Sequence, residues 1–93
     1  MAKTEMVIEM YAQNLHHAER RRAAQLVSTH WKFLDPQDRE DYMALARDIH
    51  SALYLGGGDV TAAAAHMVTH FGEGGLEGAQ DRWERIVTEA QRG

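Results

Sequence analysis

The stretch that decides the fold is 35-DPQDREDYMALARDIHSALYLGGGD-59, which is bounded by a proline and by a run of glycines. Asp35 is a good N-cap, because its carboxylate can accept from the free backbone N–H groups of a first helical turn, and Pro36 suits the first helical position. The apolar residues that follow recur at three- and four-residue steps: Tyr42, Leu45, Ala46, Ile49 and Leu53. Gly56 is typical of the position just past a helix. The stretch therefore predicts a helix over residues 36–55.

Two further helices are predicted on the C-terminal side. Asp59 is the expected N-cap of a helix over residues 60–71, and Gly72 is its expected end. The apolar stripe of that helix is Val60, Ala63, Ala64, Met67 and Phe71. The last helix is predicted over residues 76–91, with Trp83 in the core. Its apolar face is Leu76, Ala79, Trp83, Ile86, Val87 and Ala90.

The N-terminal segment predicts one long helix over residues 4–34, because it contains neither Gly nor Pro. It carries two apolar stripes. The first is Ile8, Tyr11, Leu15, Ala18, Leu26 and Phe33, interrupted by Arg22. The second is Met6, Met10, Ala24, Val27, Trp31 and Leu34. A helix that is apolar on two sides is either central to its fold or shared with a partner, and the sequence leaves both interpretations open.

Length and composition indicate one helical domain over residues 1–93. With 44% hydrophobic and 26% charged residues, the chain has ordinary globular composition. We therefore expect a small all-α four-helix bundle with a long N-terminal helix. No run of eighteen apolar residues suggests a membrane span, and the start has no signal-peptide pattern, so the expected location is the cytoplasm. Cysteine is absent, which removes disulfides and thiolate chemistry.

The net charge of −4 is unevenly distributed. Residues 3–34 carry a net +2, whereas residues 35–55 and 56–93 each carry a net −3. The acidic total argues against nucleic acid as the main partner. The N-terminal segment is the exception, since His16 and His17 precede the run Arg20, Arg21 and Arg22. This cationic band is either a solvated helix face or a contact patch for an acidic protein surface or a phosphate backbone.

Catalytic and nucleotide-binding motifs are missing from the sequence. Neither the run Gly56–Gly58 nor the stretch 72–75 has the Gly-Lys-Ser/Thr ending of a phosphate loop, and no strand precedes either one. The serines and threonines stand outside any Gly-x-Ser-x-Gly motif. We therefore expect no enzymatic activity and no cofactor.

His66 and His70 are the weak candidate for a metal site. Four residues apart on a helix, they share one face, which suits two ligands of one metal ion. A zinc-protease helix would need Glu where Met67 stands, and the remaining ligands are not identifiable. A surface role for both histidines is the alternative.

A helix-turn-helix is the nucleic-acid alternative. The turn would be residues 72–75, and the last helix would be the recognition helix. The outer face of that helix carries Glu77, Asp81 and Glu84, which would repel phosphates.

The function that the sequence favours is that of a small non-enzymatic regulator, adaptor or inhibitor that binds another protein. A homodimer is a further hypothesis for the two-sided first helix. The expected partner-binding residues combine exposed apolar side chains, which are enriched in interfaces, with cations that steer an acidic partner. They are Met6, Met10, Arg20, Arg21, Trp31, Lys32, Met43 and Tyr54.

Overall fold

The described residues form a small all-α four-helix bundle, which confirms the predicted fold class. The computed structural model describes residues 3–22 and 30–92. The helices are α1 (Lys3–Arg22), α2 (Pro36–Leu55), α3 (Val60–His70) and α4 (Ala79–Arg92), and the short 3-10 helix η1 (Trp31–Phe33) precedes α2. Within the described residues there is no strand, and no helix is both long and apolar enough to cross a bilayer.

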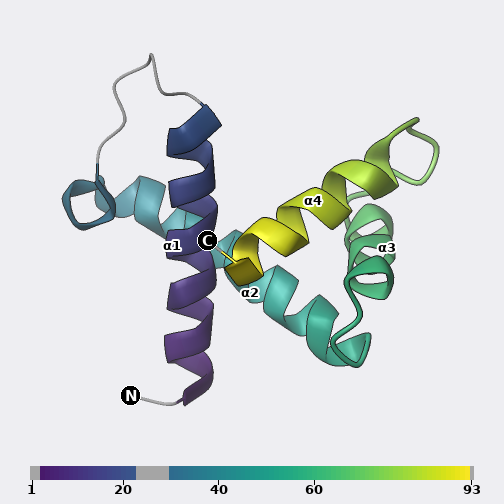
Figure 1. The fold of residues 1–93 in the computed structure, drawn as a ribbon, viewed down its shortest axis with the longest axis horizontal. Helices are drawn as coiled ribbons and strands as arrows, with labels where there is room; N and C mark the ends of the chain where they lie inside the picture. The colour runs from purple at the N-terminus through teal and green to yellow at the C-terminus, as the bar shows by residue number, and fades with distance from the viewer. Residues whose placement is uncertain (1–2, 23–29, 93) are drawn as a thin grey trace.

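The four helices form a closed ring of contacts. α2 crosses behind α1, α3 follows it at the far side, and α4 returns so that its C-terminal end lies against α1 (Figure 1). Asn14 of α1 donates to the Ala90 carbonyl of α4 at 2.7 Å, and Arg22 Nη1 lies 2.5 Å from Glu89 Oε2. The first and last helices, which lie far apart in sequence, are therefore held together, and the described part of α1 is covered on one side only.

Small side chains dominate the core. Half of the buried cluster is alanine, which allows the helices to approach closely, and the largest fully buried side chains are Ile49, Met67 and Val87. The cluster consists of Ala12, Leu15, Ala46, Ile49, Ala52, Leu53, Ala63, Ala64, Met67, Trp83, Val87 and Ala90. The predicted core position of Trp83 is confirmed. Because alanine buries little apolar surface, each large side chain carries a large share of the hydrophobic stabilisation.

The predicted bounds of α2 are confirmed at both ends, although one expected contact is absent. Pro36 is the first residue and Gly56 is the C-cap. Asp35 stands at the N-cap position, but its side chain makes no capping hydrogen bond. Its carbonyl accepts instead from the Arg39 N–H at 3.0 Å. For α3 the expected cap is present, since the Asp59 carboxylate accepts from the Ala62 N–H at 2.9 Å.

The prediction of a continuous helix as far as Leu34 is wrong at residues 30–34; residues 23–29 lie outside the described part of the chain. His30 and Leu34 have extended ψ angles of 148° and 146°, and only the 3-10 turn η1 lies between them. Asp35 precedes a proline, which disfavours helical geometry at that position. Arg39 donates to the Trp31 and Lys32 carbonyls at 3.3 Å, and these bonds replace helical ones.

The start of α4 also differs from the prediction. The helix begins at Ala79 rather than at residue 76, because Gly78 adopts a φ of +79°, which a helix cannot contain. Leu76, predicted to lie on the apolar face, is consequently 59% exposed. Glu73 accepts from Trp83 Nε1 at 2.6 Å and from Arg82, and these bonds hold the turn and lower the pKa of the Glu73 carboxyl.

The two apolar stripes of the N-terminal segment have different environments. Leu15 and Ala18 of the first stripe are buried, and Ile8 and Tyr11 are half-buried against the core. The N-terminal members of the second stripe, Met6 and Met10, are exposed. Leu26, Ala24 and Val27 lie outside the described residues. The described part of α1 thus packs on one side and leaves the opposite side open.

We predict that Ile49→Ala lowers the free energy of unfolding by about 2–5 kcal/mol, the usual range for removing a fully buried Ile side chain. Urea unfolding followed by circular dichroism measures this change. The matched control is Leu55→Ala, an exposed residue of the same helix, whose substitution should leave the urea midpoint nearly unchanged. Equal effects of the two substitutions would contradict the described core.

Candidate functional site

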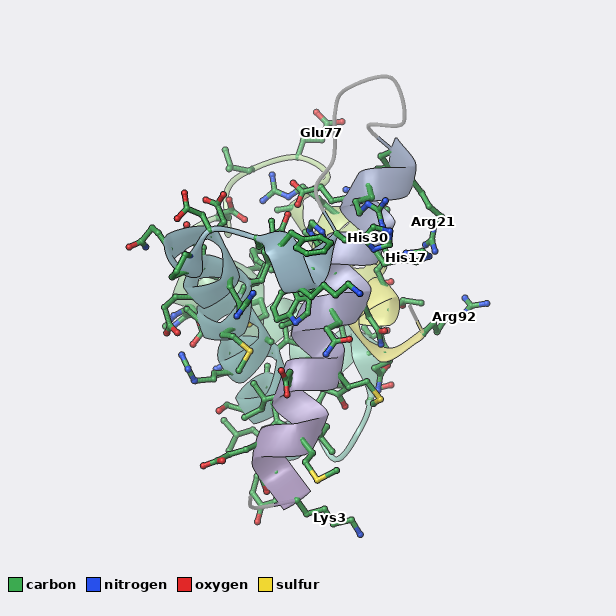
Figure 2. The ribbon with its side chains drawn as sticks, turned by 90° about the vertical axis from the view of Figure 1, so that its left-hand side faces the viewer. Lys3, His17, Arg21, His30, Glu77 and Arg92 are labelled. Carbon is green, nitrogen blue, oxygen red and sulfur yellow. The ribbon has the colours of Figure 1, made fainter. Side chains whose placement is uncertain are left out.

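One face of α1 points away from the other helices. Its residues follow three- and four-residue steps and therefore lie along one side of a helix with about 3.6 residues per turn. Lys3, His17 and Arg21 lie along this side in Figure 2. The α1 face, as we call it, consists of six exposed residues: Lys3, Met6, Met10, Gln13, His17 and Arg21.

The α1 face combines apolar and basic side chains. Met6 and Met10 are 58% and 48% exposed and lie between Lys3 at one end and His17 and Arg21 at the other. The glutamates of α1 occupy other positions around the helix: Glu5, Glu9 and Glu19. None of the three glutamates of α1 therefore lies on this face.

The predicted partner-binding residues divide into three groups. Met6, Met10 and Arg21 lie on the α1 face, and Arg20 lies half-buried at its edge. Trp31 and Met43 do not join an exposed apolar surface, because both are half-buried and pack against the core. Trp31 packs beside the rings of His16 and Tyr42, with centroid distances of 6.0 Å and 6.3 Å, and those two rings also contact each other at 5.1 Å.

Lys32 and Tyr54 form the third group, and each is separate from the α1 face. Lys32 is exposed on η1, where its Nζ lies 5.4 Å from the centroid of the Phe33 ring. Tyr54, near the end of α2, is 82% exposed. It borders a groove of about 440 Å³ between the middle of α1 and the C-terminal ends of α2 and α4. The groove is lined by Tyr11, His50, Leu53, Tyr54, Gly57, Gly58 and Gln91.

A second concave surface, which we call the cationic hollow, adjoins the C-terminal part of the α1 face. It has a volume of about 320 Å³. Arg20 Nη1 lies 3.4 Å from His30 Nδ1 at this site, and Figure 2 shows His17 and His30 beside α1. The lining residues are Gln13, Asn14, His16, His17, Arg20, His30 and Trp31. The hollow thus has donor groups but no carboxylate in its lining.

Sequence reasoning missed His30 as a site residue. The continuous helix predicted over residues 4–34 would place position 30 about 15 Å along the axis from Arg20, at about 1.5 Å per residue. The extended backbone at His30 and the turn η1 instead bring the two side chains together. The available signal was Pro36, which already indicates a helix end before residue 35.

An acidic hollow of about 480 Å³ lies at the N-terminal end of α2. Its lining combines carboxylates with apolar side chains: Glu19, Leu34, Asp38, Asp41, Tyr42 and Leu45. The Tyr42 hydroxyl donates to Glu19, and Gln37 donates to Asp41 at 3.0 Å. Burial and the neighbouring Glu19 carboxylate raise the pKa of the Tyr42 hydroxyl above its ordinary value.

The histidine pair on α3 is not completed to a metal site in the described residues. The rings of His66 and His70 stack with centroids 6.4 Å apart, and His70 Nε2 lies 3.9 Å from Asp48 Oδ2. No group of three or more His, Cys, Asp or Glu with ligand geometry occurs in the part of the chain that the structure describes. The geometry therefore does not strengthen the zinc hypothesis.

In the α3–turn–α4 unit, acidic side chains lie at the start of α4, where the recognition helix of a helix-turn-helix would contact DNA phosphates. Glu77 and Asp81 are exposed beside the start of α4, and Glu84 accepts from Gln80 at 2.8 Å. Arg82 is paired with Glu73. The electrostatics of this unit are adverse to a nucleic-acid role.

Comparison with known proteins gave no match: no protein-family model, no curated protein and no solved structure is significantly similar to this chain.

We predict that Tyr42→Phe lowers the free energy of unfolding at neutral pH by about 0.5–1.5 kcal/mol, the usual net worth of one hydrogen bond. The pKa of Tyr42 is raised on folding, so its contribution is complete below the unfolded value of about 10 and is lost as pH rises through the folded value. The difference between wild type and variant should therefore narrow above about pH 10. Urea unfolding across pH 7–11 measures both effects.

The control for this experiment is Tyr54→Phe, since the Tyr54 side chain is exposed and has no hydrogen bond in the described residues. It should leave the unfolding free energy at neutral pH unchanged. A Tyr42→Phe variant as stable as wild type at neutral pH would show that the bond to Glu19 contributes nothing.

Proposed function

We propose that this protein is a small non-enzymatic regulator, adaptor or inhibitor that binds an acidic protein surface through the α1 face. One observation carries the proposal. The exposed side of a firmly held helix presents two methionines with cations at both ends and no carboxylate from its own helix. This arrangement supports a docking surface.

The methionines favour a protein partner. Met is enriched in protein interfaces because its flexible, polarizable side chain adapts to irregular surfaces. Burying one such side chain fully contributes about 1.5–3 kcal/mol. Met6 and Met10 lie one helical turn apart, so both can enter the same apolar groove or helix face of a partner.

The flanking cations favour an acidic partner. Lys3 and Arg21 lie at the two ends of the α1 face, beyond the methionines, where they form the polar rim of an interface. Charges at a rim act mainly on the association rate and on the choice of partner, because they remain solvated. An amphipathic acidic helix complements both the apolar centre and the basic rim.

The same charges argue against a second copy of the chain as the occupant. In an antiparallel pairing of two α1 faces, Lys3 of one copy would approach Arg21 of the other. In a parallel pairing each cation would meet its own equivalent. Like charges placed opposite each other are unfavourable in both arrangements, so the homodimer hypothesis is not supported on this face.

Site-specific photo-crosslinking tests the proposal. Gln13 lies between the methionines and His17 on the α1 face, so p-benzoylphenylalanine at position 13 should cross-link a bound partner in cells that express the chain. The same group at Leu55, an exposed residue of α2, is the control position. The supporting result is an acidic protein that cross-links only from position 13 and binds the wild-type chain when purified. Cross-linking to nucleic acid, to a second copy, or equally from both positions would overturn the proposal.

We predict that Met10→Asp weakens binding of that purified partner at least tenfold, because it removes an apolar contact and places a negative charge against an acidic surface. Isothermal titration calorimetry measures the Kd. The matched control is Leu55→Asp, which changes another exposed apolar residue outside the face and should leave the Kd within a factor of two. Lys3→Gln with Arg21→Gln should slow association and reduce its dependence on salt.

A further inference from the structure

Arg20 differs from the ion-paired arginines in what its guanidinium meets. Arg22, Arg47 and Arg82 each contact a carboxylate. The described residues provide none for Arg20, whose only hydrogen-bond contact there is the one at 3.4 Å to His30. Its Nε is buried and has no hydrogen-bond partner in the described part of the chain. Among the residues that the structure describes, this half-buried guanidinium thus has no counter-ion.

The contact with His30 also determines which His30 nitrogen can donate. Arginine has donors only, so His30 Nδ1 must act as the acceptor and the ring proton of neutral His30 must sit on Nε2. The His30 Nε2–H remains available as a donor at the hollow. A long contact between a cation and an imidazole compensates little of the cost of withdrawing the guanidinium from water.

The remaining walls of the cationic hollow add to this donor set. The side chains of Gln13 and His17 line it from α1, and His30 lines it from the segment before η1. None of the lining residues is acidic. The set therefore brings amide, imidazole and guanidinium donors to one concave surface from two parts of the chain.

The hollow is held in shape by contacts that its lining residue Trp31 makes with neighbouring side chains. Arg39 donates to the carbonyls of Trp31 and Lys32 and lies over the Trp31 ring, with its Cζ 5.7 Å from the centroid. Trp31 in turn lies against His16 and Tyr42. These contacts fix η1 against α1 and α2, so the donors need little rearrangement to meet a ligand.

We infer that the cationic hollow is an oxyanion site for a phosphate monoester, free or on a phosphorylated side chain. Arginine is the preferred partner of phosphate because its planar fork of donors matches two oxygens at once. A phosphate monoester offers three terminal oxygens and a charge of about −1.5 to −2 at neutral pH, which suits donors arriving from several directions better than a carboxylate does. The inference does not rest on the docking proposal, since free phosphate can occupy the hollow whether or not a protein binds the α1 face.

The two tryptophans provide an internal comparison for the test. Trp31 lines the hollow, whereas Trp83 is buried in the core, with its Nε1 bonded to Glu73. Inorganic phosphate is titrated into the ¹⁵N-labelled full chain at pH 7.5, and the indole N–H signals are followed by NMR. Sodium chloride is lowered as phosphate is added, so that the ionic strength stays constant. We expect the Trp31 indole signal to shift and saturate while the Trp83 signal stays in place. Equal shifts of both signals, or no shift of either one, would overturn the inference.

Three variants assign the site. Arg20→Gln should weaken phosphate binding at least tenfold. Arg20→Lys, which keeps the charge but loses the fork, should retain part of the affinity. Lys3→Gln removes one positive charge from the far end of α1 and should leave the Kd within a factor of two. If Lys3→Gln weakens phosphate binding as much as Arg20→Gln, binding depends only on the overall positive charge of the chain and the inference is wrong. Thermal unfolding of each variant establishes that it is folded.

The choice of probes distinguishes the ligand classes. N-acetyl phosphoserine amide and glucose 6-phosphate represent a phosphorylated side chain and a free metabolite, and tighter binding of one over the other identifies the source. Acetate should bind at least tenfold more weakly than phosphate, and equal binding would overturn the assignment to a phosphate monoester. Duplex DNA carries phosphodiesters, so binding of a DNA oligonucleotide at Trp31 in preference to both monoesters would replace the inference with a nucleic-acid site.

Discussion

The contact between α1 and the C-terminal end of α4 is the constraint on which both proposed surfaces depend. Asn14 bonds to the Ala90 carbonyl, and Arg22 pairs with Glu89, so the first and last helices close the ring. With α2 on the adjacent side, these contacts fix the rotation of α1 about its own axis. That rotation buries Leu15 and leaves the methionines exposed. A different rotation would have exposed the first apolar stripe instead.

Local chemistry made the fold class and the bounds of α2 predictable. Pro36 and Gly56 act within a few residues of where they stand, and the stripe around Ile49 needs only helical periodicity to be recognised. The predictions failed where a tertiary contact replaced a local one. Arg39 of α2 donates to carbonyls of η1, and the positive φ at Gly78 moves the start of α4 to Ala79. Sequence patterns do not report such contacts, because the partners are set by the packing of whole helices.

The candidate site was predictable to the extent that it lies on one helix. Met6, Met10 and Arg21 share a face by spacing alone, and that grouping needed no tertiary information. The cationic hollow was not predictable, because helical spacing alone does not place His30 next to Arg20. Trp31 and Met43 were assigned to a contact surface because aromatic and Met side chains suit both cores and interfaces. Only the packing of η1 and α2 decides between these two environments.

The fold pairs some of the unevenly distributed charges of the chain with each other and places others at the two proposed surfaces. Arg22 and Glu89 neutralise each other across the helix contact, and Glu19 is engaged by the Tyr42 hydroxyl on the side of α2. These contacts pair Arg22 with Glu89 and hold the Glu19 carboxylate on a side of α1 other than the α1 face. Arg20, Arg21 and Arg22 are consecutive in sequence, yet α1 directs Arg20 to the cationic hollow, Arg21 to the α1 face and Arg22 to Glu89. An acidic protein with a net charge of −4 can therefore attract anions locally, because recognition depends on the charges near the ligand and distant charges are screened within about 8–10 Å at physiological salt.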